Sequence, residues 1–265
     1  MVIGAQADRD RLVTLSALEF DVLFEHLGLD TMPLVLKVPS PGRTHTERAE
    51  LVESAWRSLS RRGLGGPTGI DGELERMLRT LARPRREVDG RLWLGRSVRV
   101  LAAADDEHAV LAAKEDDALT LRPAAASGLP REAASVLPQL GPGPGGSVSV
   151  PSADLDAAAA EAGADVERLQ AGLRRRGVRS GDAEALTSMV GEVGARGQFG
   201  AAARDRWGRR LRGSHVVGFF DTPRGRYVQV RRQSPSGDPW STVAPVDARR
   251  MIGHLDELLA EVTGD

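Results

Sequence analysis

The sequence predicts an α+β fold that is internally duplicated. Its core is expected to be a quasi-two-fold, mostly antiparallel central sheet with helices from both copies packed around it. Two observations predict this class. Sequence landmarks from the first half of the chain recur in the second half. In each half, helix-like segments are followed by short alternating segments separated only by polar turns, which is typical of an antiparallel meander and argues against a doubly wound sheet.

The duplication is indicated by two pairs of landmarks. Val38-Pro39-Ser40 follows an apolar run, and Val150-Pro151-Ser152 follows another about 112 residues later. Downstream, Arg61-Arg62-Gly63-Leu64 and Arg175-Arg176-Gly177-Val178 each close a helix-like segment. A single period that spans half of the chain indicates a duplication, because solenoid arrays have shorter periods and at least three copies.

The chain is therefore expected to be one domain built from two repeats, at about residues 11–140 and 147–262. Residues 141–146 read Gly-Pro-Gly-Pro-Gly-Gly and are interpreted as the linker between the repeats. A linker of this length is too short to separate domains widely, so we expect the two halves to dock.

In the first half, helical spacing of apolar residues begins after a capping box formed by Ser16 and Glu19, and Gly28 ends that helix. Periodicity predicts helices at 15–27, 46–62, 71–81 and 129–137. Alternation predicts strands at 34–40, 86–94, 97–103, 108–113 and 118–122.

The second half repeats this order. Periodicity predicts helices at 152–162, 165–176, 181–193 and 246–262. Alternation predicts strands at 148–150, 198–205, 215–221, 226–232 and 240–244. Pro223-Arg224-Gly225 has the composition of a hairpin turn between two of these strands.

The composition is that of an ordinary globular protein, with 41% hydrophobic and 28% charged residues. With a net charge of −1, the chain as a whole is not attracted electrostatically to nucleic acid or to an anionic membrane. The absence of cysteine excludes disulfides and thiol nucleophiles and agrees with a reducing compartment. The first eleven residues have no apolar run of the kind found in secretion signals, so a cytoplasmic location is expected.

No catalytic constellation is apparent, and an enzyme is not expected. The five histidines, His26, His45, His108, His215 and His254, are scattered over different segments without metal-ligand spacing. The glycine-rich 141–146 segment lacks the Lys-Ser/Thr of a phosphate loop. Ser147 and Ser214 stand outside any nucleophile elbow. The sequence therefore predicts no metal, no nucleotide and no other cofactor.

The alternative function is a nucleic-acid binding module. The densest basic stripe runs from Arg204 to Arg212 and contains Trp207, which could stack on bases. The competing interpretation is that these arginines are solvated or paired with Asp205 and Asp221, because the chain is neutral overall and no second basic face is evident.

The segment Leu15-Ser16-Ala17-Leu18-Glu19-Phe20-Asp21-Val22-Leu23, with Gly28, Pro33 and Val38-Pro39-Ser40, resembles the opening of the EspG family. That family consists of proteins associated with type VII (ESX) secretion in actinobacteria. Gly197-Gln198-Phe199-Gly200 and Asp221-Thr222-Pro223-Arg224-Gly225-Arg226-Tyr227 resemble the most recognisable stretch of the family's second half. The resemblance covers about residues 11 to 262.

This resemblance implies a quasi-two-fold α+β fold in which the central sheet is flanked by two helical bundles. It also implies a cytosolic chaperone that keeps helical PE/PPE-like secreted substrates soluble for export. In the family, the helical tip of the substrate docks on the central sheet and the C-terminal helical bundle, with help from a loop between two first-half strands. Here the corresponding turn, Leu94-Gly95-Arg96-Ser97, is short, so an extended clamp is not expected. Neither nucleic acid nor a membrane is expected as a partner, and weak self-association is left open.

Two apolar sets are candidates for the partner-binding surface. Leu186, Met189, Val190 and Val193 lie at i, i+3, i+4 and i+7 of an expected helix. Phe219 and Phe220 are neighbours in an expected strand, so one of them faces away from the core. The competing interpretation for both sets is ordinary core packing.

Overall fold

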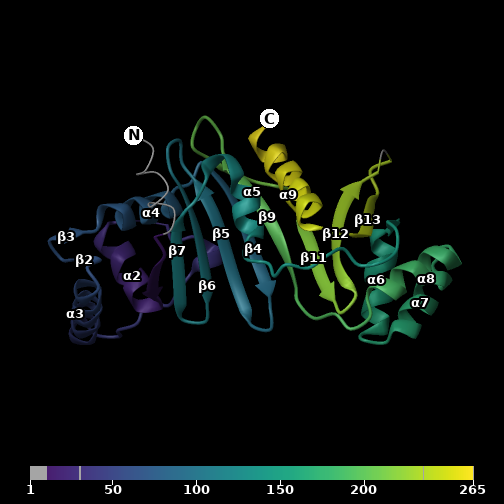
Figure 1. Cartoon of the computed structure of the whole chain (residues 1–265), viewed down its shortest axis with the longest axis horizontal. Helices are drawn as coiled ribbons and strands as arrows, with labels where there is room; N and C mark the ends of the chain where they lie inside the picture. Colours follow the sequence, from purple (N-terminus) through teal and green to yellow (C-terminus); the bar gives the residue numbers. More distant parts are fainter. Residues whose placement is uncertain (1–10, 30, 235, 265) are drawn as a thin grey trace. The chain divides into compact units, whose positions relative to one another are not determined.

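A computed structural model describes residues 11–29, 31–234 and 236–264. The N-terminal segment that argues against a secretion signal lies almost entirely outside these residues. The chain forms two compact units (Figure 1). Unit 1 comprises Met1–Arg91, Arg96–Ala133 and Ala202–Leu211, and unit 2 comprises Leu92–Gly95, Ala134–Ala201 and Arg212–Asp265.

Unit 1 begins with a short strand, continues with helices and ends with an antiparallel meander. Its helices are α2 (Ala17–His26), α3 (His45–Arg61), α4 (Gly72–Ala82) and α5 (Leu129–Ala134, whose last residue belongs to unit 2), with 3-10 turns η1 (Leu34–Leu36) and η2 (Ala126–Gly128). Its sheet strands are β1 (Val13–Ser16), β4 (Arg86–Trp93), β5 (Ser97–Ala104), β6 (Ala109–Glu115) and β7 (Ala118–Pro123). The order in space is β1-β7-β6-β5-β4, and a separate hairpin is formed by β2 (Gly65–Gly66) and β3 (Gly69–Ile70).

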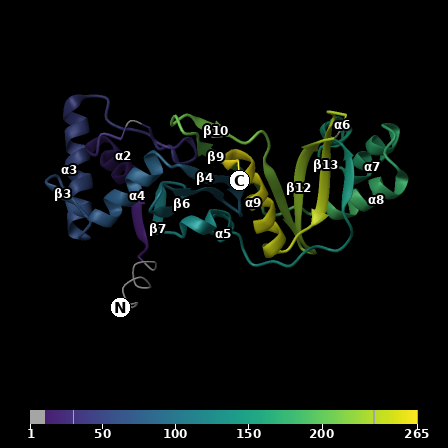
Figure 2. The same cartoon turned by 90° about the horizontal axis from the view of Figure 1, so that it is seen from above.

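Unit 2 follows the same plan. Its helices are α6 (Ser152–Ala162), α7 (Val166–Arg175), α8 (Ser180–Met189) and α9 (Ala248–Thr263). Its strands are β8 (Val148–Pro151), β9 (Arg196–Arg204), β11 (Val217–Thr222), β12 (Gly225–Gln233) and β13 (Pro239–Pro245), in the spatial order β8-β13-β12-β11-β9. The short strand β10 (Arg210–Arg212) pairs with β9, whose last residues belong to unit 1. Figures 1 and 2 show α6, α7 and α8 grouped beside β13.

The two strand orders are identical when each strand is matched by its place along the chain. In both units the first strand pairs with the last, antiparallel: Val13 is opposite Leu121 in unit 1, and Val148 is opposite Val243 in unit 2. The remaining strands of each unit then run back in sequence. The duplicated, mostly antiparallel α+β fold is therefore confirmed, whereas the boundaries at 11–140 and 147–262 remain a prediction.

The Arg-Arg-Gly landmarks occupy equivalent positions at the ends of α3 and α7. Gly63 and Gly177 both have positive φ, 68° and 85°, a conformation that glycine adopts at little steric cost. The backbone N–H of Leu64 donates to Leu59 O and that of Val178 donates to Leu173 O, both at about 3.0–3.1 Å. The same local chemistry therefore ends the second-last helix before the meander in each unit.

The Val-Pro-Ser landmark is wrong as a matched pair of strands. Val150 and Pro151 lie in β8, but Val38 lies in an irregular segment after η1, and its N–H donates to the Met32 sulfur at 3.4 Å. Pro39 has no backbone N–H to donate to a neighbouring strand, and Pro33 precedes a 3-10 turn instead of a strand. The true counterpart of β8 is β1, which includes Leu15, a residue expected in the following helix.

Segment 141–146 is packed against β12 within unit 2. Gly143 N donates to Arg226 O, Arg226 N donates to Gly141 O, and the Tyr227 hydroxyl donates to Pro144 O at 3.1 Å. A Cβ on Gly143 would stand 2.1 Å from the Tyr227 ring, so only glycine fits there. We call residues 141–146 the strap, because they are held along the strand by these bonds.

Candidate functional site

The strand residues Phe219 and Phe220 face opposite sides of the unit 2 sheet. Phe219 is 3% exposed, and its ring lies 6.0 Å from that of Phe199. Phe220 is half-buried, stacks on Tyr227 with a centroid distance of 5.2 Å, and packs at the edge of the cluster formed by the α6–α8 bundle. Of the two, Phe220 is therefore the residue that a partner could reach.

The α8 residues divide between core and surface. Leu186 and Met189 are each 1% exposed and belong to the bundle core, so the structure places them as packing residues. Helix α8 ends at Met189, with Val190 as its C-cap, and Val193 lies beyond it at 37% exposure. The expected helix over 181–193 is thus too long.

The early end of α8 has a local cause. Gly191 and Gly194 are poor helix formers, and Glu192 adopts a positive φ of 51°. Gly194 N donates to Asp221 O at 2.9 Å, which joins this turn to β11. As a result Val193 follows the bend instead of continuing the apolar stripe.

One candidate partner surface therefore remains from the predicted set, formed by Val190, Val193 and Phe220. We call it the bundle–sheet surface, because the valines lie at the end of α8 and the phenylalanine lies on β11. Strand register places Gly218 on the same face of β11, opposite Gln198 on β9 and Gln229 on β12. Gln198 is exposed, so the apolar residues have a polar border on the sheet.

Sequence reasoning missed two features of this region. The glutamines were not singled out, although the alternation of β9 and β12 with period 2 could have placed them on the same face of the sheet as Phe220. Trp240, which is 39% exposed, lies on the opposite face of the sheet with Phe219, as the β12–β13 register requires. It is therefore outside the bundle–sheet surface.

The Asp-Thr-Pro-Arg-Gly-Arg-Tyr stretch is a structural hairpin. Asp221 and Arg226 face each other across the strands and form a buried two-pronged ion pair, with Nε–Oδ1 at 2.7 Å and Nη2–Oδ2 at 2.8 Å. Arg226 Nη2 also donates to Pro138 O at 2.9 Å. Thr222 Oγ1 accepts from Arg224 N and donates to Gly225 O, which closes the turn. These residues hold the strap and the hairpin together, and their polar groups are occupied by that task.

The basic stripe from Arg204 to Arg212 is largely engaged within the chain. Arg209 pairs with Asp205 at 2.8 Å, and Arg210 pairs with Glu87. Arg204 donates to the carbonyls of Pro84 and Gly208. The structure therefore pairs most of the charges on which a nucleic-acid groove would depend, although the predicted partner Asp221 is bonded to Arg226 instead.

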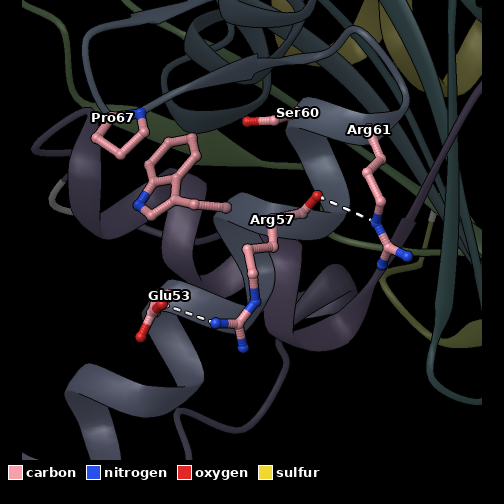
Figure 3. A pocket seen from close by; sticks show the side chains of 6 residues that line it. Glu53, Arg57, Ser60, Arg61 and Pro67 are labelled. Atoms are coloured by element: carbon pink, nitrogen blue, oxygen red, sulfur yellow. Dashed lines mark hydrogen bonds and ion pairs between the residues drawn. The ribbon is translucent and has the colours of Figure 1, made fainter.

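A hollow of about 600 Å³ lies along α3 beside the β2–β3 hairpin. Its lining residues are Glu53, Trp56, Arg57, Ser60, Arg61 and Pro67. Figure 3 shows Arg57 directed toward Glu53, an ion pair of 2.7 Å, and Arg61 donating to the Arg57 carbonyl. Ser60 donates to Gly65 O at 2.9 Å. These polar groups are each bonded within the chain, and Ser60 donates to a backbone carbonyl and not to a base, so the hollow offers no nucleophile and base in contact.

Among the residues that the structure describes, no group of three or more His, Asp or Glu side chains is placed to hold a metal ion. The histidines lie on separate elements: His26 packs against Trp56, His108 contacts Asp105, and His215 contacts Glu261. Within the described part of the chain, no helix is both long and apolar enough to cross a membrane.

Comparison with models of protein families shows to which family the chain belongs. The model of the EspG family matches residues 16–257, which is most of the chain. The chain belongs to the EspG family. No curated protein matches the chain by sequence.

The EspG fold is also seen in a solved structure, that of the Mycobacterium tuberculosis type VII secretion system chaperone EspG5 in complex with the PE25–PPE41 dimer. The TM-score is 0.74 at 17% sequence identity, over 95% of this chain and 97% of that chain. At this identity the likeness establishes the fold. The turn between β4 and β5 is short, as the sequence predicts, because β4 ends at Trp93 and β5 begins at Ser97.

Proposed function

We propose that this EspG-family protein is a cytoplasmic, non-enzymatic chaperone of a type VII secretion system. It holds helical PE/PPE-like substrates soluble before export. The observation that carries the proposal is family membership over residues 16–257, together with a fold like that of a chaperone solved with its PE–PPE pair.

The chemistry of the bundle–sheet surface supports this function. A helical tip that is apolar in isolation needs an apolar patch with a polar border, and Val190, Val193 and Phe220 bordered by Gln198 supply that combination. No catalytic group is needed, because binding alone shields the substrate from aggregation. We therefore propose that the substrate's helical tip binds at this surface.

Co-expression tests the proposal. The protein is produced with a PE–PPE pair encoded in the same genome, and the soluble, co-purifying fraction of the pair is measured. The expected result is a stoichiometric soluble complex with the wild-type protein and aggregated substrate without it. A pair that stays insoluble, or that stays soluble without binding, contradicts the proposed function.

Two valines of the helical bundle provide a matched pair of variants. Val193 is 37% exposed at the proposed surface, and Val166 is 38% exposed at the start of α7. Val193→Asp is expected to weaken substrate binding by about tenfold or more, as for a central contact of an interface. Val166→Asp should leave binding unchanged, which separates loss of the contact from a general effect of added charge.

The nucleic-acid alternative predicts a different salt dependence. Binding through several phosphates weakens steeply as salt rises, whereas an apolar contact is much less affected. Substrate capture by the protein should therefore persist between low and moderate salt.

A further inference from the structure

An exposed aromatic residue lies at the tip of the β9–β10 hairpin, in a part of the chain that the proposed substrate surface does not use. Trp207 is 65% exposed, the largest exposure of any tryptophan in the described chain. Figure 2 shows β10 beside β9, with the hairpin extending beyond the strands. The equivalent connection between β4 and β5 is only a short turn, so the hairpin is particular to the second repeat.

The hairpin tip, residues 205–209, is a defined structure. Asp205 N donates to Arg209 O at 3.0 Å, and the Asp205 carboxylate accepts from the backbone N–H groups of Trp207 and Arg209, each at 2.9 Å. Burial raises the pKa of the Asp205 carboxyl, but the hydrogen bond from the Arg209 guanidinium and those from the backbone N–H groups of Arg209 and Trp207 outweigh it. The pKa of Asp205 therefore lies below its ordinary value, and the carboxylate is ionised at neutral pH. Trp207 is thus presented on an ordered turn.

Two guanidinium groups at the hairpin tip remain available for a partner, Arg206 over the ring of Trp207 and Arg83 beside Gly208. The guanidinium of Arg206 lies 4.0 Å from the centroid of the indole ring, and Arg206 is exposed. Arg83 Nη2 lies 3.4 Å from the position that a Cβ on Gly208 would take, and Arg83 is also exposed. Within the described residues neither forms an ion pair with a carboxylate, in contrast to Arg209 with Asp205. The tip therefore carries an excess of positive charge around an apolar ring.

This arrangement favours a carboxylate-bearing peptide over a nucleic acid. A phosphate backbone is bound by a row of free cations, but Arg204, Arg209 and Arg210 are already bonded within the chain. The indole also has the guanidinium groups of Arg206 and Arg209 over it, at 4.0 and 5.0 Å, where a base would stack. Guanidinium groups bind carboxylates with two parallel hydrogen bonds, and the edge of the indole can contact an aliphatic side chain next to them.

We infer that the hairpin tip binds a short acidic segment of a partner protein through Arg83, Arg206 and Trp207. All three residues belong to unit 1. This set shares no residue with Val190, Val193 and Phe220, so it can be tested independently of the proposed chaperone function.

Titration followed by NMR tests this inference on the full-length protein. The probe is a blocked synthetic peptide of Glu, Asp and Leu, and the readout is the indole N–H signal of Trp207, assigned with Trp207→Phe. The expected result is a saturable shift of this signal while the other indole signals stay in place. Arg206→Glu should weaken binding by about tenfold or more, because it replaces attraction with repulsion at a partly exposed pair.

Arg249→Glu is the matched control, since it makes the same change of net charge at an exposed position of α9. It should bind the peptide as the wild type does. Equal binding of a peptide with Gln and Asn in place of the acids would overturn the inference, as would the absence of a saturable Trp207 shift. Tighter binding of an oligothymidylate than of the acidic peptide would overturn it in favour of nucleic acid.

Discussion

At the scale of single residues, Met189 decides between a surface and a core interpretation of α8. Its side chain is 1% exposed and lies in the bundle core. Met189→Asp is therefore expected to destabilise the fold by about 3 kcal/mol or more, because it buries an unpaired charge. Thermal melts and urea unfolding measure the change.

The control for Met189→Asp is Val193→Asp, which places the same charge at a position that is 37% exposed. Its melting temperature should stay close to that of the wild type. If Met189→Asp melts like the wild type and loses substrate binding instead, the assignment of Met189 to the core is wrong.

Asp71 provides a prediction about pH. It caps α4 by accepting from Leu74 N at 3.0 Å and pairs with Arg11 at 2.9 Å. Burial raises the pKa of Asp71, but the Leu74 N–H and the Arg11 guanidinium together outweigh this and leave the pKa below its ordinary value of 3.8.

Because the pKa of Asp71 is lower in the folded chain, its ionisation stabilises the fold above pH 3.8, and this stabilisation is lost as the pH falls through the folded pKa. Asp71→Asn keeps a good N-cap residue without the charge. The difference in urea midpoint between wild type and variant should therefore be largest near neutral pH and shrink below pH 4. A difference that is constant from pH 7 to pH 3 would show that the charge contributes nothing.

The residue-level predictions from sequence were partly successful, for a physical reason. Alternation along β11 correctly indicates that one phenylalanine faces away from the core, but it cannot tell which one, because helices cover both faces of a sheet in different places. Phe220 faces the α6–α8 bundle and Phe219 faces the other side. Which side remains accessible depends on tertiary packing that no local pattern contains.

At the scale of elements, the strap is the feature most clearly missed by the sequence. Its composition indicates a short linker between the repeats but not the hydrogen bonds by which Gly141 and Gly143 hold it to β12. Gly143→Ala is expected to cost about 2 kcal/mol or more, because the new methyl would stand 2.1 Å from the rigid Tyr227 ring.

Gly141→Ala is the control in the same segment, since nothing lies within 4 Å of its added Cβ and its φ is not positive. Urea unfolding of the two variants should separate them clearly. Equal, small effects would mean that the strap is not held against Tyr227.

Helix positions were largely predictable, since caps and periodicity are local. The Ser16–Glu19 capping box forms as predicted, and α6 matches its predicted range of 152–162. The failures are short segments near proline and glycine. β1 has only 4 residues, too few to show a period, and its strand character depends on pairing with β7, more than a hundred residues away in sequence.

At the scale of the whole molecule, the duplication is the property that the sequence indicated best, although one of its two landmarks was misleading. Arg-Arg-Gly is matched correctly because it ends equivalent helices, whereas Val-Pro-Ser matched an irregular segment with a strand. Shared strand order is more reliable evidence of the duplication than shared tripeptides, because the packing of entire elements sets the order of the strands.

The prediction that the chain is one domain of two repeats can be tested by calorimetry. A single domain should unfold in one cooperative transition, with equal calorimetric and van't Hoff enthalpies. Two resolved transitions would indicate that the repeats fold as separate domains. Met189→Asp distinguishes the two cases. It should lower the melting temperature of the whole transition if the chain is one domain, but of only one of the two transitions if the repeats fold separately.

The central claim is that a helical type VII secretion substrate binds the bundle–sheet surface. Hydrogen–deuterium exchange of the protein, free and in complex with a co-expressed PE–PPE pair, measures this most directly. We predict slower exchange in the complex at β11 and at the residues that follow α8 through Val193, with little change around Val166. A complex that forms without protection at β11 and Val193 would contradict the claim.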